Sequence, residues 1–301
     1  MIDRLQKILH PDDIFVEELL AAHTTFRVGG PAEFFITPRC TNEVAQICEI
    51  CRTEDIPLFI LGDGSNVLVS DAGLRGVVLC TAKLDKIAVL DSGLITAQAG
   101  AKLAKVAQEA HKAGLAGFEF ASGIPGTVGG AVYMNAGAYD GTVGEFCKSV
   151  TMLQNCRTIK TIPGSEMNFG YRQSIAQTNG GFILEATFQL HPGNTDEILA
   201  KMRDLNNRRR KSQPLEYPSA GSTFKRPPGY FAGKLIEDSG LKGFTIGGAQ
   251  VSEKHAGFVI NIGQAGRTSA HDIYNLIQEV QRQVYEKFQI QLEPEVKILG
   301  F

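Results

Sequence analysis

The sequence predicts an α+β protein, because strand-like and helix-like segments occur without the regular βαβ alternation of a doubly wound sheet. Apolar residues recur at helical spacing in KLAKVAQEAHKAGL and again across residues 273–288, which predicts two amphipathic helices. Short β-like runs separated by glycine-containing turns fill much of the remainder, and glycine accounts for 33 of the 301 residues. This length is sufficient for about two domains.

The N-terminal third begins with a short helical segment, followed by strand-like residues in HTTFRVGGPAEFFITP. A helix is expected from Thr41 to about Arg52. The stretch IPLFILGDGSNVLVS then predicts a buried strand, a turn at residues 62–66 and a second strand. Short β-runs occupy residues 74–100, and the helix that follows them is expected to end at Gly114.

The remaining chain contains mixed strands in residues 147–190 and then a polar, basic helix from about Asp196 to Lys211. Gln213-Pro214 ends this helix, and the composition changes there, so a domain boundary is expected. A strongly amphipathic helix and a strand-like tail, LEPEVKILGF, complete the chain.

Charge and hydropathy exclude several classes of protein. The net charge is −2, so no overall positive field attracts nucleic acid or an anionic membrane. No stretch is long and apolar enough to span a bilayer, and the charged N-terminus lacks the apolar core of a signal peptide. A cytoplasmic location is therefore the expectation.

Cysteine and histidine patterns do not predict a metal site. Cys48 and Cys51 form a CxxC pair, but with Val44 and Ile47 they recur at helical spacing, so both thiols are expected to face a core. No second CxxC accompanies them, and the six histidines are scattered. Six cysteines in a chain of this length do not indicate a disulfide framework.

Two glycine-containing loops, LGDGSN at 61–66 and SGIPGTVGG at 122–130, are candidates for binding a phosphate group. Neither has the spacing of a Walker A motif or of the dinucleotide fingerprint GxGxxG. Both expose successive backbone N–H groups beside small polar side chains, and two such loops can enclose a pyrophosphate. The alternative is that each is only a tight turn, and the spacing alone leaves both interpretations open.

Seven motifs together resemble one known family. TTFRVGGPAEFF, ILGDGSNVLVSD, GIPGTVGGAVYMNAGAY, YRQS, AGSTFKRP, AGKLIEDSGLKG and LEPEVKILG occur in the order found in the UDP-N-acetylenolpyruvoylglucosamine reductases, and they span nearly the whole chain. The resemblance is to the shorter form of that family. It implies a two-part FAD-binding module of the vanillyl-alcohol-oxidase type and a C-terminal α+β substrate-binding domain.

The resemblance also implies domain limits and cofactor contacts. The implied parts are FAD-binding subdomain 1 at 1–83, which the tail 296–301 is a candidate to rejoin, subdomain 2 at 84–206, and the substrate-binding domain at 207–295. FAD is expected to bind noncovalently, with NADPH as the reductant and a UDP-sugar as the substrate. The implied cofactor-binding residues are Gly62, Asp63, Gly64, Ser65, Asn66, Ser122, Gly123, Ile124, Pro125, Gly126, Thr127, Gly129, Gly130, Asn135, Gly137, Ala138 and Tyr171.

Three residues match the catalytic positions of the family. Arg172 is expected to stabilise the negative charge that develops on an enolpyruvyl carboxylate, because a guanidinium can bind a carboxylate through two hydrogen bonds. Ser222 is expected to donate a proton to the neighbouring carbon. Glu295 is expected to act as a protonated carboxyl group, with Glu293 as the competing choice. Taken alone, each is also explained as an ordinary surface or turn residue.

Lys225 and Arg226 are candidates for contacts with the diphosphate or carboxylate of the substrate, although a basic pair before two prolines is also typical of a solvated turn. The expected function is therefore NADPH-dependent, FAD-mediated reduction of UDP-N-acetylglucosamine enolpyruvate in peptidoglycan precursor synthesis. Two alternatives stay open at this point: an FAD-linked oxidase of the same superfamily, and a nucleotide-binding module without catalytic activity. No metal, nucleic acid, membrane or obligate protein partner is predicted.

Overall fold

The computed structural model describes residues 1–263 and 268–301, and within them the chain forms two compact units. The units are built from separated stretches of the chain: 1–16, 34–63 and 76–209 in the larger, and 17–33, 64–75 and 210–301 in the smaller. Each unit has buried apolar clusters of its own. The division into three parts predicted from the sequence stays a prediction.

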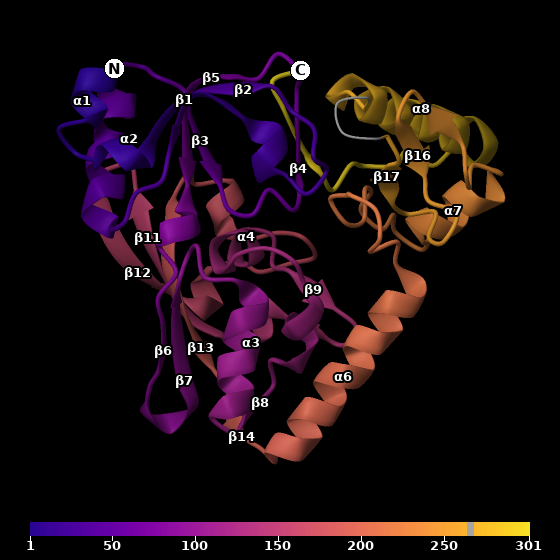
Figure 1. Ribbon diagram of the computed structural model, residues 1–301. Helices are drawn as coiled ribbons and strands as arrows, with labels where there is room; N and C mark the ends of the chain where they lie inside the picture. Colours follow the sequence, from indigo (N-terminus) through magenta and orange to yellow (C-terminus); the bar gives the residue numbers. More distant parts are fainter. Residues whose placement is uncertain (264–267) are drawn as a thin grey trace. The chain divides into compact units, whose positions relative to one another are not determined.

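An antiparallel sheet forms the centre of one cluster in the larger unit, with strand order β12-β11-β13-β7-β6. Its strands are β12 (Thr158–Pro163), β11 (Cys147–Gln154), β13 (Phe182–Gln189), β7 (Leu94–Gln98) and β6 (Ile87–Val89). Helix α4 (Val128–Tyr133) packs against β13 and β7, and α3 (Leu103–Lys112) packs against β6 and β7 (Figure 1). The sheet and these helices enclose apolar side chains that include Phe118 and Phe188.

Helix α3 is the helix that the sequence predicts in KLAKVAQEAHKAGL. All four of its inward-facing apolar residues are buried, which is the pattern an amphipathic helix requires. Gly114 follows the helix with a φ of 66°, a left-handed conformation that glycine adopts without a steric penalty. The prediction of this helix and of its end is therefore confirmed.

A second sheet has the order β1-β2-β5-β3, and its strands β3 and β5 run parallel. Its members are β1 (Ile14–Leu19), β2 (Pro31–Ile36), β5 (Leu74–Cys80) and β3 (Leu58–Leu61). The prediction of a fully buried strand at β3 is wrong, because Ile60 is 50% exposed and only Leu61 of this strand is buried. The reason is topological: β3 stands last in the strand order, so the sheet does not enclose it on both sides.

Other elements of the first 212 residues are short, apart from two helices. Helix α2 (Thr41–Thr53) lies where the sequence predicts it, and α6 (Thr195–Ser212) matches the predicted polar, basic helix. The short elements are α1 (Ile2–Leu5), α5 (Val143–Phe146), β8 (Leu115–Ala116) paired with β14 (His191–Pro192), and β9 (Gly137–Ala138) paired with β10 (Gly141–Thr142). Single 3-10 turns occur at Pro11–Asp13, Leu20–His23, Thr81–Lys83, Asp91–Gly93, Glu119–Gly123, Gly164–Glu166 and Ile175–Gln177.

The smaller unit is built around α8 (Ala270–Phe288), the second predicted amphipathic helix. Ser269 and Asp272 form a capping box at its N-terminus, which satisfies backbone N–H groups that the helix itself leaves unpaired. The other elements are α7 (Ala232–Asp238), the antiparallel strands β15 (Thr245–Ile246), β16 (Ala249–Val251) and β17 (Val259–Asn261), and the parallel pair β4 (Val67–Val69) and β18 (Lys297–Leu299). Phe26, Val28 and Leu68 contribute to the same apolar cluster as α8.

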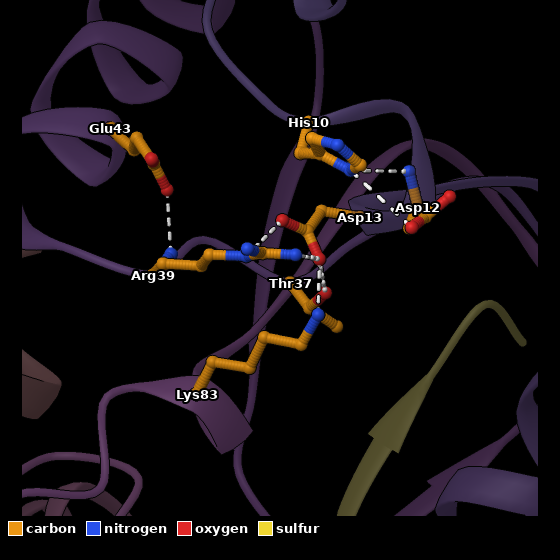
Figure 2. A network of polar contacts seen from close by, with 7 residues as sticks. All are labelled: His10, Asp12, Asp13, Thr37, Arg39, Glu43 and Lys83. Atoms are coloured by element: carbon orange, nitrogen blue, oxygen red, sulfur yellow. Dashed lines mark hydrogen bonds and ion pairs between the residues drawn. The ribbon is translucent and has the colours of Figure 1, made fainter.

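A buried carboxylate, Asp13, anchors a polar network in the larger unit (Figure 2). Arg39 Nε pairs with Asp13 Oδ2 at 2.6 Å, Lys83 pairs with Oδ1, and the Thr37 hydroxyl donates to Oδ1 at 3.2 Å. Burial raises the pKa of Asp13, but the hydrogen bonds and positive charges of Lys83 and Arg39 outweigh it, so the pKa lies below the ordinary value. The carboxylate is therefore ionised inside the fold.

Cys48 and Cys51 are each 2% exposed on the inner face of α2, as the spacing predicts. All six cysteines are free thiols.

Across residues 1–263 and 268–301, no helix combines the length and apolar character needed to cross a membrane.

Candidate active site

The first candidate loop and the second candidate loop meet within the larger unit. A Cβ added to Gly62 would lie 2.4 Å from Thr127 Oγ1, so the Thr127 side chain packs against the Gly62 backbone in the space that a side chain at residue 62 would need. The ammonium group of Lys102 pairs with Asp63, and Lys102 also forms an antiparallel bridge with Thr127. One lysine therefore connects the two loops.

The second loop is held by the strand-like residues that precede α3. The amide of Val128 donates to the carbonyl of Ala101 at 2.8 Å, and that of Gly129 donates to Ala99 at 2.8 Å. A Cβ on Gly129 would lie 3.0 Å from the Cβ of Ala99, so a small residue is required. The Thr127 side chain caps α4 by accepting from the Gly130 amide at 3.5 Å.

The N-terminal part of this loop contacts α6. The Ser122 hydroxyl donates to the Glu119 carbonyl at 2.8 Å and accepts from Asn206 Nδ2 at 3.2 Å. A Cβ on Gly123 would lie 2.3 Å from Asn206 Oδ1. Ile124 packs against the apolar cluster, and the exposed Pro125 and the left-handed Gly126 (φ 117°) turn the chain toward Thr127.

Asn135 is a buried structural connector. Its Nδ2 donates to the Gly170 carbonyl at 2.9 Å, and its Oδ1 accepts from the Gly144 amide at 2.8 Å. Both ends of the amide therefore bond to the protein backbone. The short pairing of Gly137 and Ala138 with β10 follows directly after it.

Arg172 lies beside this pairing, because its Nη1 donates to the Gly137 carbonyl at 3.4 Å. Its φ of 55° is left-handed, which is uncommon for a residue with a Cβ. Gln177 Nε2 supports this conformation by donating to the Arg172 carbonyl at 2.9 Å. The guanidinium lies 5.4 Å from the ring centroid of Tyr171, which is 58% exposed.

Ser222 and Glu295 lie on two segments that pair in the smaller unit. The Glu295 amide donates to the Thr223 carbonyl at 2.8 Å, and the Lys225 amide donates to the Glu293 carbonyl at 2.9 Å. Phe224 and Pro294 form the antiparallel bridge between these two bonds. The residue next to Ser222 is therefore bonded directly to Glu295.

The first loop continues into the smaller unit and contacts the segment that contains Glu295. Asn66 Nδ2 donates to the Glu295 carbonyl at 3.1 Å, and the Lys297 amide donates to the Asn66 carbonyl at 3.0 Å. Gly64 has a φ of 61°, and a Cβ there would lie 2.1 Å from the His23 carbonyl oxygen, so glycine is required. Ser65 lies in the turn between Gly64 and Asn66.

The two candidate acids differ in their surroundings. Glu293 is 68% exposed and pairs with the Lys225 ammonium, whereas Glu295 is half-buried. Glu295 is therefore the less exposed of the two carboxyl groups. The guanidinium of Arg226 lies 4.5 Å from the ring centroid of Phe231.

Lys102 and Asn206 were not among the residues expected from the sequence. Each makes a side-chain contact with a candidate loop, Lys102 with Asp63 and Asn206 with Ser122. The sequence carries no local signal for either contact, because one residue precedes a helix and the other lies within a polar helix.

The glycines at 62, 123 and 129 allow Thr127, Asn206 and Ala99 to pack directly against the backbone of the two loops. Gly130 is exposed, and a Cβ there would meet no described atom closer than 3.8 Å, while its amide donates to Thr127 Oγ1. The Lys102 ammonium adds a positive charge to the same place. An exposed glycine turn beside an ammonium group suits a phosphate group, and so the residues present fit FAD. Among the described residues, no group of His, Cys, Asp and Glu is arranged to hold a metal ion.

Comparison with family models identifies the class of protein. Residues 32–158, which include both candidate loops, match the model described as FAD binding domain. Residues 213–299 match the model described as the C-terminal domain of UDP-N-acetylenolpyruvoylglucosamine reductase. The chain is an FAD-dependent oxidoreductase of mixed α and β structure.

Individual relatives identify the family. The chain is 48% identical over 300 residues to the UDP-N-acetylenolpyruvoylglucosamine reductase of Caldanaerobacter subterraneus subsp. tengcongensis, covering 100% of this chain and 98% of that protein. It is 50% identical over 296 residues to the enzyme of the same name from Clostridium perfringens, covering 98% and 96%. The crystal structure of the reductase from Thermus caldophilus matches with a TM-score of 0.81 and 34% identity, covering 95% of this chain and 100% of that one. The chain belongs to the UDP-N-acetylenolpyruvoylglucosamine reductase family, whose activity serves peptidoglycan precursor synthesis.

Proposed function

We propose that the chain binds FAD noncovalently and uses NADPH to reduce UDP-N-acetylglucosamine enolpyruvate to UDP-N-acetylmuramate. Membership of the family supports this proposal. The structural observation that carries it is the pairing of the Ser222 segment with the Glu295 segment, in which the Glu295 amide donates to the carbonyl of Thr223, the residue that follows Ser222. FAD, when bound, supplies the hydride chemistry between the nicotinamide and the enolpyruvyl group.

The cofactor contacts are proposed for both loops. The meeting of Gly62 with Thr127 and the exposed position of Gly130 support a pyrophosphate position between the loops. Asn135, whose side chain is bonded to backbone groups, is proposed to shape the flavin end of the site rather than to donate to the ring. The remaining proposed contacts are Asp63, Gly64, Ser65, Asn66, Ser122, Gly123, Ile124, Pro125, Gly126, Gly129, Gly137, Ala138 and Tyr171.

Arg172 is proposed to stabilise the carboxylate of the enolpyruvyl group. Hydride addition to the outer carbon leaves negative charge on the adjacent carbon and its carboxylate, and a fixed guanidinium lowers the energy of that charge. The left-handed backbone of Arg172 supports this role, because strained conformations concentrate at functional sites. Tyr171 restricts one face of the guanidinium.

Ser222 is proposed to donate the proton that completes the reduction, and Glu295 is proposed to act as a protonated carboxyl group beside the substrate carboxylate. A serine hydroxyl is a weak acid, but a carbanion-like carbon is basic enough to take its proton. A neutral Glu295 donates a hydrogen bond where an ionised one would repel the substrate.

Lys225 and Arg226 are proposed to contact the diphosphate of the substrate. Lys225 would then exchange its ion pair with Glu293 for one with the ligand.

The decisive experiment separates the two half-reactions of Ser222→Ala by stopped-flow absorbance. NADPH should reduce the flavin at the normal rate, whereas reoxidation by the enolpyruvyl substrate should slow by about 10²- to 10⁴-fold. Ser239→Ala is the matched control, because the Ser239 hydroxyl only bonds the Leu235 carbonyl of α7. Equal loss in both half-reactions would reject Ser222 as the proton donor, and rapid reoxidation by oxygen alone would favour an oxidase.

A further inference from the structure

A third cysteine lies against the cysteine pair of α2. Cys156 belongs to the turn between β11 and β12 and packs against the apolar cluster that contains Cys48 and Cys51. Cys156 is close enough to Cys48 to contribute to the raised pKa of the Cys48 thiol. A thiol from a residue 108 positions further along the chain therefore packs against the cluster that contains Cys48.

The turn that carries Cys156 is fixed on α2. Asn155 and Cys156 have φ values of 50° and 57°, and the Arg157 amide closes the turn by donating to the Gln154 carbonyl at 3.0 Å. A left-handed conformation is unfavourable for a residue with a Cβ, so tertiary contacts must hold it. One such contact is the ion pair between Arg157 Nη2 and Glu49 Oε1 at 3.2 Å, one residue after Cys48.

Access to solvent distinguishes the thiols. Cys156 is half-buried and lines a solvent-open groove together with Arg4, Lys7 and Arg157. Cys48 and Cys51 are buried behind it. Burial, together with the neighbouring Cys156, raises the pKa of Cys48, and burial raises that of Cys51 to about 11. Both buried side chains therefore stay as protonated thiols, and a small oxidant that enters the groove meets Cys156 first.

We propose that Cys156 and Cys48 form a thiol pair that a hydroperoxide converts into a disulfide. The Cys156 sulfur attacks the peroxide, the O–O bond breaks, and an alcohol or water leaves as Cys156 becomes a sulfenic acid. The Cys48 sulfur then attacks the Cys156 sulfur, the S–O bond breaks, and water leaves with the Cys48 proton. Two thiols lose two electrons in total, and the peroxide gains them.

This disulfide ties α2 to the β11–β12 hairpin. A crosslink that closes a loop of about 100 residues restricts the unfolded chain more than a short one, so the oxidised protein should melt about 5–10 °C higher than the reduced protein. The stabilisation should disappear when a dithiol reductant is added.

The test treats the full-length flavoprotein, without NADPH, with one equivalent of hydrogen peroxide and then blocks the remaining thiols with N-ethylmaleimide. Trypsin places Cys156 in the peptide 149–157 and Cys48 in the peptide 40–52. The expected product is a crosslink of these two peptides that fragmentation assigns to Cys48, together with the rise in melting temperature. Cys156→Ser should abolish both, and Cys40→Ser, which changes an exposed cysteine of the same tryptic peptide, should abolish neither.

Three results would overturn the proposal. They are a disulfide between Cys48 and Cys51, oxidation of Cys156 to the sulfinic acid without a crosslink, and a Cys156 that stays alkylatable after peroxide. Cys156 lies in a half-buried turn, so the test does not depend on the folding of a variant at the buried Cys48.

Discussion

Gly62→Ala tests the approach of the two candidate cofactor loops directly. The new Cβ would lie 2.4 Å from Thr127 Oγ1, about 1 Å closer than an ordinary contact between carbon and oxygen. Gly62 does not have a positive φ, so alanine adds no backbone strain. Any effect of the substitution therefore reports the contact between the loops.

The size of the effect follows from overpacking. An extra methyl group in a tight site costs about 1–3 kcal/mol, and every 1.4 kcal/mol corresponds to a tenfold change in an equilibrium constant. If the loops move apart to relieve the contact and FAD requires them in place, the Kd for FAD should rise by about 5- to 150-fold. If the apoprotein absorbs part of the strain, its free energy of unfolding should fall by up to the same amount.

The assay titrates apoprotein with FAD and follows the flavin fluorescence, while urea unfolding of the apoprotein gives its stability. Gly170→Ala is the control, because a Cβ there meets nothing closer than 3.6 Å. In the Thr127→Ala background, which removes Oγ1, the cost of Gly62→Ala should shrink toward zero. An unchanged Kd in Gly62→Ala, or equal costs in both backgrounds, would refute the reasoning.

Two further predictions concern stability. Lys83 and Arg39 lower the pKa of Asp13 below its ordinary value of 3.8. The ionised Asp13 therefore stabilises the folded state fully above about pH 5. This stabilisation is lost as the pH falls through 3.8 and then through the lower pKa of the folded state. Asp13→Asn should lower stability at pH 7 and flatten the acid limb of the curve of unfolding free energy against pH; an unchanged acid limb would contradict this. Ser269→Ala removes half of the capping box of α8. It should lower the free energy of unfolding, measured by urea titration, by about 1 kcal/mol. A change below about 0.3 kcal/mol would show that the cap contributes little.

Local sequence was sufficient to predict the four long helices α2, α3, α6 and α8, but not the short helices α4, α5 and α7 or the meeting of distant segments. Helix α3 could be predicted because its four buried positions and the terminal Gly114 all lie within twelve residues. The burial of β3 could not, because the same apolar run serves an edge strand and a central strand equally well. Only the strand order distinguishes the two cases.

The candidate site shows the same limit. The glycine loops could be recognised from their composition, but the contact between Gly62 and Thr127 depends on the fold of about 65 intervening residues. Likewise, nothing near Phe26 or Leu68 in the sequence indicates that these residues join the apolar cluster of α8. Side chains that connect distant segments, such as Lys102, were therefore missed.

The parallel pairing of β4 with β18 has a consequence for the order in which the protein assembles during translation. The hydrogen bond from Asn66 to Glu295 joins residues 229 positions apart, so Asn66 leaves the ribosome long before its partner exists. At the usual rate of about 5–20 residues per second, that delay is about 10–45 s. Throughout this interval the nascent chain carries β4 without its partner strand β18. Asn66 and Glu295 can form their hydrogen bond only when synthesis of the chain is nearly complete.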